Sequence, residues 1–223
     1  MIQTATFVAT ILAALGVAPC AQAAPNPTSR ALQTTPNGEG FHDGYFYHWW
    51  SDGGAPASYA NGNAGAYQLA WETGGNLFGG KGWKSGNPRN ISYAAEWKPV
   101  NDGNSYLSIY GYTKNPQVDY YIIESHGSYD PCSKAEVRGT IDHAGSTYKL
   151  CSSRTVTWDG TLSHYYAVRR DQRTRGTVDT GVIFAAWAEH GMPLGKHEYQ
   201  LVATEAYFST GSSSVVIDTP AEA

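Results

Sequence analysis

The chain has 223 residues and a formal net charge of −4, and 15% of its residues are charged, whereas about 25% is usual. A weakly acidic chain is unsuited to the phosphate backbone of nucleic acids, and an aromatic content of 13% argues against intrinsic disorder. One folded domain with a mostly uncharged polar surface is therefore expected.

The amino-terminal segment, residues 1–23, is typical of a cleaved secretory signal. Its apolar run from Phe7 to Pro19 is too short to span a bilayer, and Ala21 and Ala23 form the small-x-small pattern of a signal-peptidase site. A buried amino-terminal helix is the alternative interpretation. We therefore predict a secreted, extracellular protein that is not held in a membrane.

After the predicted signal, the chain divides into a short polar segment and one domain. Residues 24–40 are rich in Pro, Thr, Asn and Gly and are expected to form a linker or pro-segment, residues 41–219 the domain, and residues 220–223 a tail. Within the domain, short runs rich in Tyr, Val, Ile and Trp alternate with turn dipeptides, which predicts an all-β fold. The dipeptides are Asp43-Gly44, Asp52-Gly53, Asn61-Gly62, Asp102-Gly103 and Asp159-Gly160.

Two runs, residues 104–112 and 117–125, show the two-residue alternation of a strand. In the second run, one face holds Val118, Tyr120 and Ile122 and the other holds Asp119, Tyr121 and Ile123. A single helix is expected near residues 180–190, with Asp179 in its first turn and Gly191 at its end. The sequence predicts two packed antiparallel sheets with one outer α-helix.

The cysteines predict a cross-link. Removal of the signal leaves Cys132 and Cys151, and an even pair in an oxidising compartment predicts a disulfide; two separate buried thiols are the alternative. Asn90 begins the one Asn-x-Ser/Thr sequon without a central Pro and is a candidate glycosylation site. The sequence has no zinc-type Cys/His spacing, Gly-x-Ser-x-Gly, His-Glu-x-x-His or phosphate loop, so we expect no metal and no cofactor.

Two acidic residues lie inside strand-like runs that are rich in tyrosine. Asp119 shares a face with Tyr121, and Glu205 shares one with Tyr199 and Tyr207. Aromatic neighbours remove water from a carboxyl group and raise its pKa, as a general acid requires, and their ring faces can stack on sugars. Two carboxylates in an aromatic cleft are suited to glycoside hydrolysis. The alternative is that both are solvated residues of an outer face.

Six segments, in order along the domain, carry a more specific pattern. They are GYFYHWWSDGG (44–54), GGNLFGGKGW (74–83), NSYLSIYGYTKNPQVDYYIIESHGSYDP (104–131), YAVRRDQRTRGTVDT (166–180), FAAWAEHG (184–191) and EYQLVATEAYFSTGSSS (198–214). The segments resemble those of glycoside hydrolase family 11, the secreted endo-1,4-β-xylanases, and the resemblance extends from about Gly40 to Thr219. It implies a β-jelly roll whose concave cleft holds the substrate, and a retaining reaction without metal or cofactor. The expected partner is xylan or xylo-oligosaccharides, with no nucleic acid, and the protein is expected to be a monomer.

The resemblance also implies roles for single residues. Glu205 takes the position of the acid/base, and Asp119 takes the position of the nucleophile, which is a Glu in the family's Pro-x-Val/Ile-Glu-Tyr-Tyr motif. Asn76 would hydrogen-bond the acid/base, which suggests a near-neutral pH optimum. The expected substrate-binding set, in which Tyr110 and Tyr121 also orient the nucleophile, is Trp50, Asn76, Tyr110, Tyr121, His164 and Tyr199.

Departures from the family pattern gather at the expected active site. Asp119 is one methylene shorter than Glu, which withdraws the carboxylate by about 1.5 Å, toward the wider carboxyl spacing of inverting enzymes. His164 stands where the family has a Gln beside the nucleophile. The family's thumb loop is shortened to residues 153–161, with Trp158 near its tip, and Ala206 replaces a Gly after the acid/base.

Two hypotheses of different class follow from these residues. The first is an endo-acting hydrolase that cleaves internal β-1,4-xylosidic bonds of plant cell-wall xylan, with altered or reduced activity allowed by Asp119. The second is a catalytically impaired, xylan-binding or decoy-like protein on the same fold. Hydrolysis of another β-1,4-glucan is a third, weaker alternative.

Overall fold

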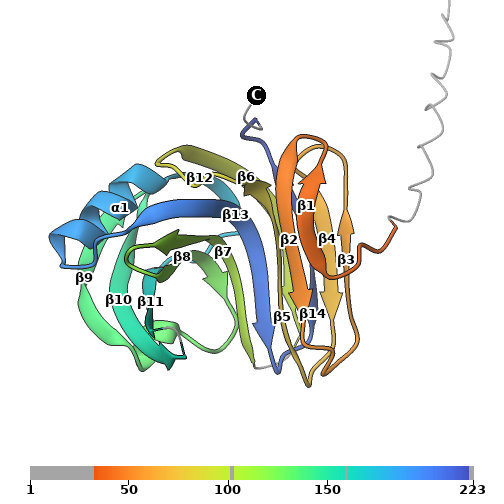
Figure 1. Ribbon diagram of the computed structural model, residues 1–223, viewed down its shortest axis with the longest axis horizontal. Helices are drawn as coiled ribbons and strands as arrows, with labels where there is room; N and C mark the ends of the chain where they lie inside the picture. Colours follow the sequence, from red (N-terminus) through yellow and green to blue (C-terminus); the bar gives the residue numbers. More distant parts are fainter. Residues whose placement is uncertain (1–32, 101–102, 159, 221–223) are drawn as a thin grey trace, which may run out of the picture. The chain divides into compact units, whose positions relative to one another are not determined.

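The computed structural model describes residues 33–100, 103–158 and 160–220 (Figure 1). These residues form fourteen strands, one α-helix and one short 3-10 helix. The strands are β1 (Gly38–His42), β2 (Tyr45–Ser51), β3 (Ala57–Asn61), β4 (Tyr67–Trp71), β5 (Asn76–Trp83), β6 (Asn90–Pro99), β7 (Asn104–Lys114), β8 (Val118–His126), β9 (Glu136–His143), β10 (Ser146–Thr157), β11 (Gly160–Arg169), β12 (Arg175–Asp179), β13 (Lys196–Tyr207) and β14 (Gly211–Ile217). The helices are η1 (Pro131–Ser133) and α1 (Thr180–Glu189).

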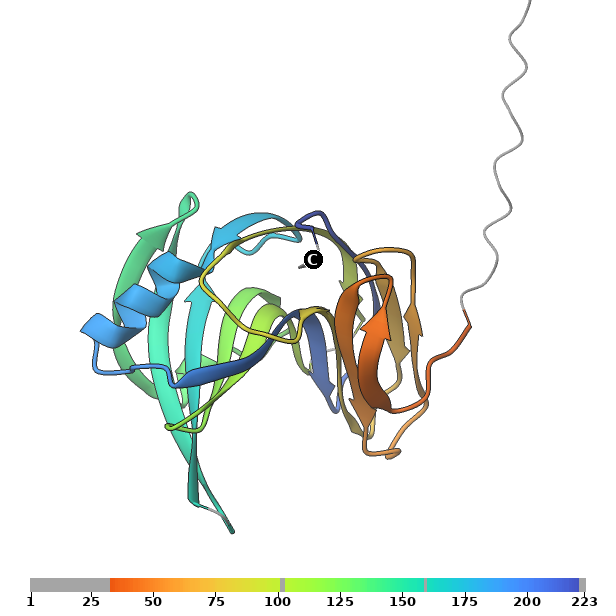
Figure 2. The ribbon, with the colours of Figure 1, turned by 45° about the horizontal axis from the view of Figure 1, so that its top comes forward.

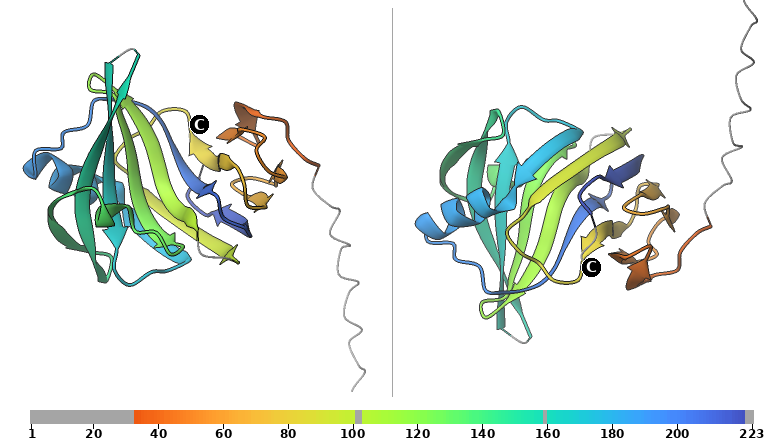
Figure 3. Two further views of the ribbon diagram at one scale, coloured as in Figure 1. Left: turned by 90° about the horizontal axis from the view of Figure 1, so that it is seen from below. Right: turned by 90° about the horizontal axis from the view of Figure 1, so that it is seen from above.

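The strands form two sheets, which confirms the all-β, jelly-roll sandwich. One sheet has nine strands in the order β1-β2-β5-β13-β7-β8-β11-β10-β9, and the other has five in the order β12-β6-β14-β4-β3. Figure 2 shows that the larger sheet bends strongly, and the views of Figure 3 show α1 on the outside, where it contacts β9 and β6. One face of the larger sheet is therefore covered, and its concave face is open.

An aromatic core fills the space between the sheets. Trp49 of the larger sheet stacks on Tyr59 of the smaller one, with ring centroids 5.6 Å apart, and Tyr59 stacks on Tyr67 at 5.5 Å. Trp187 of α1 is fully buried against Tyr120. Each large apolar side chain stabilises the fold by about 1.5–3 kcal/mol on burial, so this cluster favours face-to-face packing of the sheets. As the alternation predicts, β8 contributes its even-numbered apolar residues to this core: Val118, Tyr120 and Ile122.

The expected helix is confirmed as α1. Asp179 is its N-cap, and the Asp179 carboxylate accepts a hydrogen bond of 2.9 Å from the Gly181 amide, which satisfies one of the free donors of the first turn. Gly191 follows the helix with φ of +74°, a conformation that glycine adopts without steric cost. Local capping chemistry therefore sets both ends of this helix.

The prediction that both sheets are antiparallel is wrong at one position. Strands β8 and β11 pair in parallel, from Val118 opposite Ser163 to Ile123 opposite Val168. The chain between β8 and β9, residues 127–135, turns back before β9, so that β9 and β11 both run in the direction of β8 and β10 runs against them. The alternation of residues along a strand does not show whether neighbouring strands run parallel or antiparallel, because it depends only on which face each residue occupies.

The larger sheet begins shortly before the expected start of the domain, whose bounds stay a prediction. Strand β1 begins at Gly38 and pairs with β2 from Gly38 opposite Trp49 onward, so the sheet starts three residues before the expected boundary at Phe41. Gly38 and Gly40 made this stretch resemble a linker. The predicted signal (1–23), residues 24–32 of the expected linker, Asp102, Asp159 and residues 221–223 of the expected tail lie outside the described residues.

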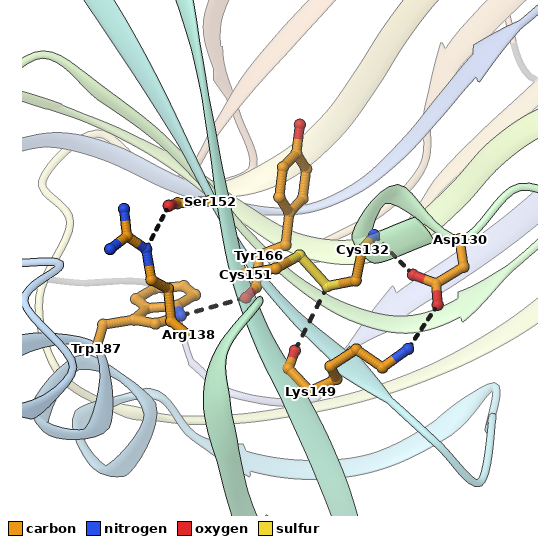
Figure 4. Close-up of a disulfide and its surroundings, with 8 residues drawn as sticks. All are labelled: Asp130, Cys132, Arg138, Lys149, Cys151, Ser152, Tyr166 and Trp187. Carbon is orange, nitrogen blue, oxygen red and sulfur yellow. Dashed lines mark hydrogen bonds and ion pairs between the residues drawn. A yellow bond between two sulfur atoms is a disulfide. The ribbon is translucent and has the colours of Figure 1, made fainter. Parts of the chain in front are cut away.

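The predicted disulfide between Cys132 and Cys151 is confirmed (Figure 4). Cys132 lies in η1 and Cys151 in β10, and both side chains are buried at the edge of the concave face. The Asp130 carboxylate accepts a hydrogen bond of 2.8 Å from the Cys132 amide and lies 3.1 Å from the Lys149 ammonium. The disulfide thus fixes the turn after β8 to the β10–β11 hairpin.

Replacement of both cysteines, Cys132→Ala with Cys151→Ala, should lower the free energy of unfolding by about 3 kcal/mol, the loss expected for a closed loop of this length. Guanidinium titration of oxidised protein measures this change. Reductant supplies the matched control, because it should destabilise the wild type and leave the double variant unaltered. An equal unfolding midpoint for the oxidised wild type and the double variant would contradict the role of this disulfide in stability.

Candidate active site

The open face of the larger sheet carries a second aromatic cluster. Tyr110 and Tyr121 are buried within it, with ring centroids 5.0 Å apart, and Tyr166 stacks on Tyr121 at 5.2 Å. A cavity of about 240 Å³ opens beside these rings, and Glu205 is among its lining residues. Since the sheet curves around this side (Figure 2), the cluster forms the floor of a concave, aromatic cleft.

Asp119 reaches this cleft from β8, on the face opposite the core. Its Oδ1 accepts a hydrogen bond of 2.8 Å from the Tyr110 hydroxyl, and its Oδ2 lies 3.7 Å from Nδ1 of His164. The Asp119 side chain is only 16% exposed. Burial raises the pKa of Asp119 above its ordinary value, whereas the Tyr110 hydrogen bond and His164 lower it. The carboxylate is thus partly dehydrated and still has partners that stabilise its ionised form.

Glu205 reaches the cleft from β13, two strands away from Asp119. Burial raises the pKa of Glu205 to about 7, the negative charge of Asp119 adds to this shift, and a hydrogen bond from Tyr121 opposes it. Half-burial among aromatic rings therefore keeps a proton on Glu205 at a pH where an exposed carboxyl has lost it. Burial raises the pKa of both carboxyl groups, but only Asp119 has a histidine beside it, and Asp119 itself raises the pKa of Glu205.

The tyrosine pair links the two carboxyl groups. Tyr110 of β7 lies opposite Tyr121 of β8 in the sheet register, and it donates to Asp119 while Tyr121 bonds Glu205. The Tyr110 hydroxyl is also 3.5 Å from that of Tyr199 on β13. Three expected substrate-binding tyrosines are thus brought together with both expected catalytic residues.

The remaining predicted residues differ in how near they lie to the two carboxyl groups. His164 is beside Asp119, and its Nε2 lies 3.1 Å from Oγ1 of Thr155. Trp50, at the end of β2 on the cleft side, is 42% exposed, as a stacking platform for a sugar requires. Asn76 shares a face with Glu205 but lies opposite Tyr207, so the register alone does not bring the Asn76 amide to the acid/base.

A model of glycosyl hydrolases family 11 matches residues 42–216, most of the described domain. The chain belongs to glycosyl hydrolases family 11.

Curated relatives of this family 11 chain carry xylanase names. Ethylene-inducing xylanase 4 of Verticillium dahliae is 54% identical over 196 residues, which are 86% of this chain and 89% of the relative. Endo-1,4-beta-xylanase 1 of Pyricularia oryzae is 47% identical over 194 residues, 85% and 83% of the two chains. A solved endo-1,4-beta-xylanase of Trichoderma reesei superimposes with a TM-score of 0.71 at 33% identity and covers 78% of this chain and 97% of its own.

The hairpin of β10 and β11, which contains the stretch expected to correspond to the family's thumb loop, projects past the rest of the sheet in Figure 2. Pairing continues to Thr157 opposite Gly160, so Trp158 stands at the tip, as expected, and its side chain is 98% exposed. Ser153, at the base of the hairpin, and Tyr166 of β11 line the cleft cavity. The hairpin therefore forms one wall of the cleft.

A third carboxyl group, Glu124 of β8, has a structural role. It is 1% exposed and points to the core side, where it accepts hydrogen bonds from Tyr93 at 2.8 Å and from Arg173 at 2.5 Å. The hydroxyl of Tyr148 also donates to it. These donors occupy Glu124 on the face opposite the cleft, so its burial does not make it a catalytic group.

Several cleft residues were missed in the sequence. His48 and Phe78 adjoin Tyr199 and Tyr110, and their positions in β2 and β5 follow the strand alternation that identified the other residues. Tyr129 and Lys134 come from the turn between β8 and β9, which has no periodic pattern.

Asn90 is exposed at the start of β6, as attachment of a glycan requires, and its glycosylation stays a prediction. In the described part of the chain, no helix has the length and apolar character needed to cross a membrane.

Proposed function

We propose that this family 11 chain is an endo-1,4-β-xylanase that cleaves internal β-1,4-xylosidic bonds of plant cell-wall xylan. The observation that supports this function most directly is the pair of half-buried carboxyl groups in the cleft, Asp119 held by Tyr110 and Glu205 held by Tyr121. The xylanase names of the relatives supply the substrate.

The proposed reaction uses the two carboxyl groups in different protonation states. Protonated Glu205 donates its proton to the glycosidic oxygen of the leaving sugar while ionised Asp119 attacks C1, which breaks the C1–O bond and forms a covalent glycosyl-enzyme. Glu205, now a carboxylate, then takes a proton from water as that water displaces Asp119 from C1. The β configuration is retained because C1 is inverted twice.

The cleft surface suits a neutral polysaccharide. Xylan offers hydroxyl groups and the faces of its sugar rings, and the cleft presents tyrosine hydroxyls and aromatic rings, with Trp50 exposed at its edge. A purely xylan-binding, decoy-like role is not favoured, because binding alone does not require a carboxyl group with a pKa raised to about 7, as that of Glu205 is.

We propose further that the protein is secreted and acts as a monomer. Residues 1–23 have the pattern of an export signal, and a disulfide is suited to an oxidising compartment. One chain supplies every residue of the proposed site, so no second subunit is needed to complete it.

Reducing-sugar release from xylan, cellulose and xyloglucan, assayed in parallel, tests the substrate. Release from xylan well above the other two polymers is the expected result. No release from xylan above that of a boiled sample would refute the enzymatic function, and preferential release from cellulose would assign another β-1,4-glucan.

The pH profile of kcat/KM for xylan hydrolysis should be bell-shaped. Because Glu205 must carry a proton and burial raises its pKa to about 7, kcat/KM should fall about tenfold per pH unit above pH 7. Because Asp119 must be ionised and burial raises its pKa, the acid limb should lie above the ordinary aspartate value of 3.8. An alkaline limb centred near 4.5, the ordinary value for glutamate, would contradict the proposed environment of Glu205.

A further inference from the structure

Two adjoining cavities extend the cleft beyond Glu205 along the turn between β8 and β9. The first, of about 240 Å³, includes Glu205 in its lining, and the second, of about 450 Å³, includes Tyr207 and Phe208. The residues that line both are Asn104, Tyr129 and Lys134. A chain of sugars that leaves the catalytic pair in this direction therefore passes Lys134.

Lys134 brings a positive charge to a surface that is otherwise polar and aromatic. Its ammonium lies 5.8 Å from the centre of the Tyr129 ring, and it forms no ion pair with the described residues. The nearby acid Asp130 already faces the ammonium of Lys149 at 3.1 Å. Glu205, the carboxyl group among the lining residues of these two cavities, holds a proton below about pH 7 because burial raises its pKa.

The backbone that carries Lys134 is firmly placed. Lys134 directly follows η1, and its amide donates a hydrogen bond of 3.4 Å to the Pro131 carbonyl. Cys132 in the same turn is bonded to Cys151 of β10 (Figure 4). The long side chain can move, but its attachment point at the rim of the cavities is held by a cross-link, which limits the entropy lost when the ammonium meets a ligand.

We propose that Lys134 forms a subsite for an acidic branch of the polysaccharide, and that its ammonium binds the carboxylate of a uronic acid attached to the xylan main chain. This inference rests on the proposed xylanase function, since it assigns a substrate feature to the same cleft. The aromatic rings of Tyr129 and Tyr207 supply apolar surface for sugar rings, and Lys134 supplies the one group there that distinguishes a charged branch from a neutral one.

Binding to a single polymer in two chemical forms tests this subsite. Uronic-acid-branched xylan is compared with the same xylan after its carboxyl groups are reduced to alcohols, and affinity is measured by calorimetry with the Glu205→Gln variant, in which hydrolysis is slow. The acidic form should bind about two- to fivefold more tightly, the range expected of one exposed charge pair, and salt at 0.5 M should remove most of this difference through a Debye length of roughly 4 Å.

The charge variant Lys134→Met should bring the ratio of the two affinities to about one. Lys98→Met is the matched control, because it removes one exposed lysine from the smaller sheet, and it should keep the ratio. Equal affinities in the protein that retains Lys134, or an unchanged ratio in Lys134→Met, would overturn the proposal. Hydrolysis of unbranched xylan by the wild type is assayed separately, so failure of the xylanase function is distinguished from failure of the subsite.

Discussion

The Glu205→Gln variant should hydrolyse xylan roughly 10²- to 10⁴-fold more slowly than the wild type, the range that a positioned general acid or base contributes. Glutamine is close in shape to glutamic acid and can keep the hydrogen bond with Tyr121, but it has no acidic proton to transfer to the leaving oxygen. The change therefore removes proton transfer and leaves the packing of β13 in place. Initial rates of reducing-sugar release measure the effect.

A substrate with a different leaving group distinguishes the loss of the proton donor from structural damage to the cleft. An aryl xyloside with a stable phenolate leaving group needs no protonation, so the first step of Glu205→Gln should be nearly as fast as that of the wild type, seen as a burst of phenol. The matched control is Glu198→Gln, which neutralises an acid of the same strand that pairs with Lys114, and it should retain full activity on xylan. An equal loss on both substrates would contradict the role of Glu205 as proton donor.

Strand alternation predicted much of this site because it depends only on local chain geometry. It placed Asp119 and Tyr121 on one face of β8 and Tyr120 on the other, and the structure confirms both faces. The family resemblance then placed His164 beside Asp119, a contact between strands that lie far apart in the sequence. Local pattern alone gives no register between β8 and β11, so it could not predict this contact.

Other features depend on long-range arrangement and were beyond the sequence pattern. The parallel pairing of β8 with β11 follows from the turn at residues 127–135. The same turn places Tyr129 and Lys134 at the cleft, although neither belongs to a periodic run. Glu124 illustrates the converse case, because its burial suggests a reactive carboxyl group, whereas the donors Tyr93 and Arg173 make it structural.

The Asp119→Asn variant should lose activity by roughly 10⁴-fold or more, as hydrolases do when a covalent nucleophile is removed. Its amide can still accept the hydrogen bond from Tyr110, so the cleft should stay folded, with an unfolding midpoint close to that of the wild type. A 2-fluoro xyloside with an activated leaving group should lose that group and add its 2-fluoroxylosyl group to Asp119 in the wild type and not in Asp119→Asn. This adduct is the direct measure of nucleophilic attack.

The length of Asp119 sets the more exacting test. The Asp119→Glu variant extends the carboxylate by about 1.5 Å toward C1 and should raise kcat. In the wild type, the shorter Asp119 side chain reaches C1 only when the sugar moves toward it. NMR of the first products should show the β anomer for both proteins. If the wild type instead released the α anomer first and formed no adduct, Asp119 would be acting as a base on water, with His164 Nδ1 3.7 Å away as its neighbour, and double displacement would be excluded.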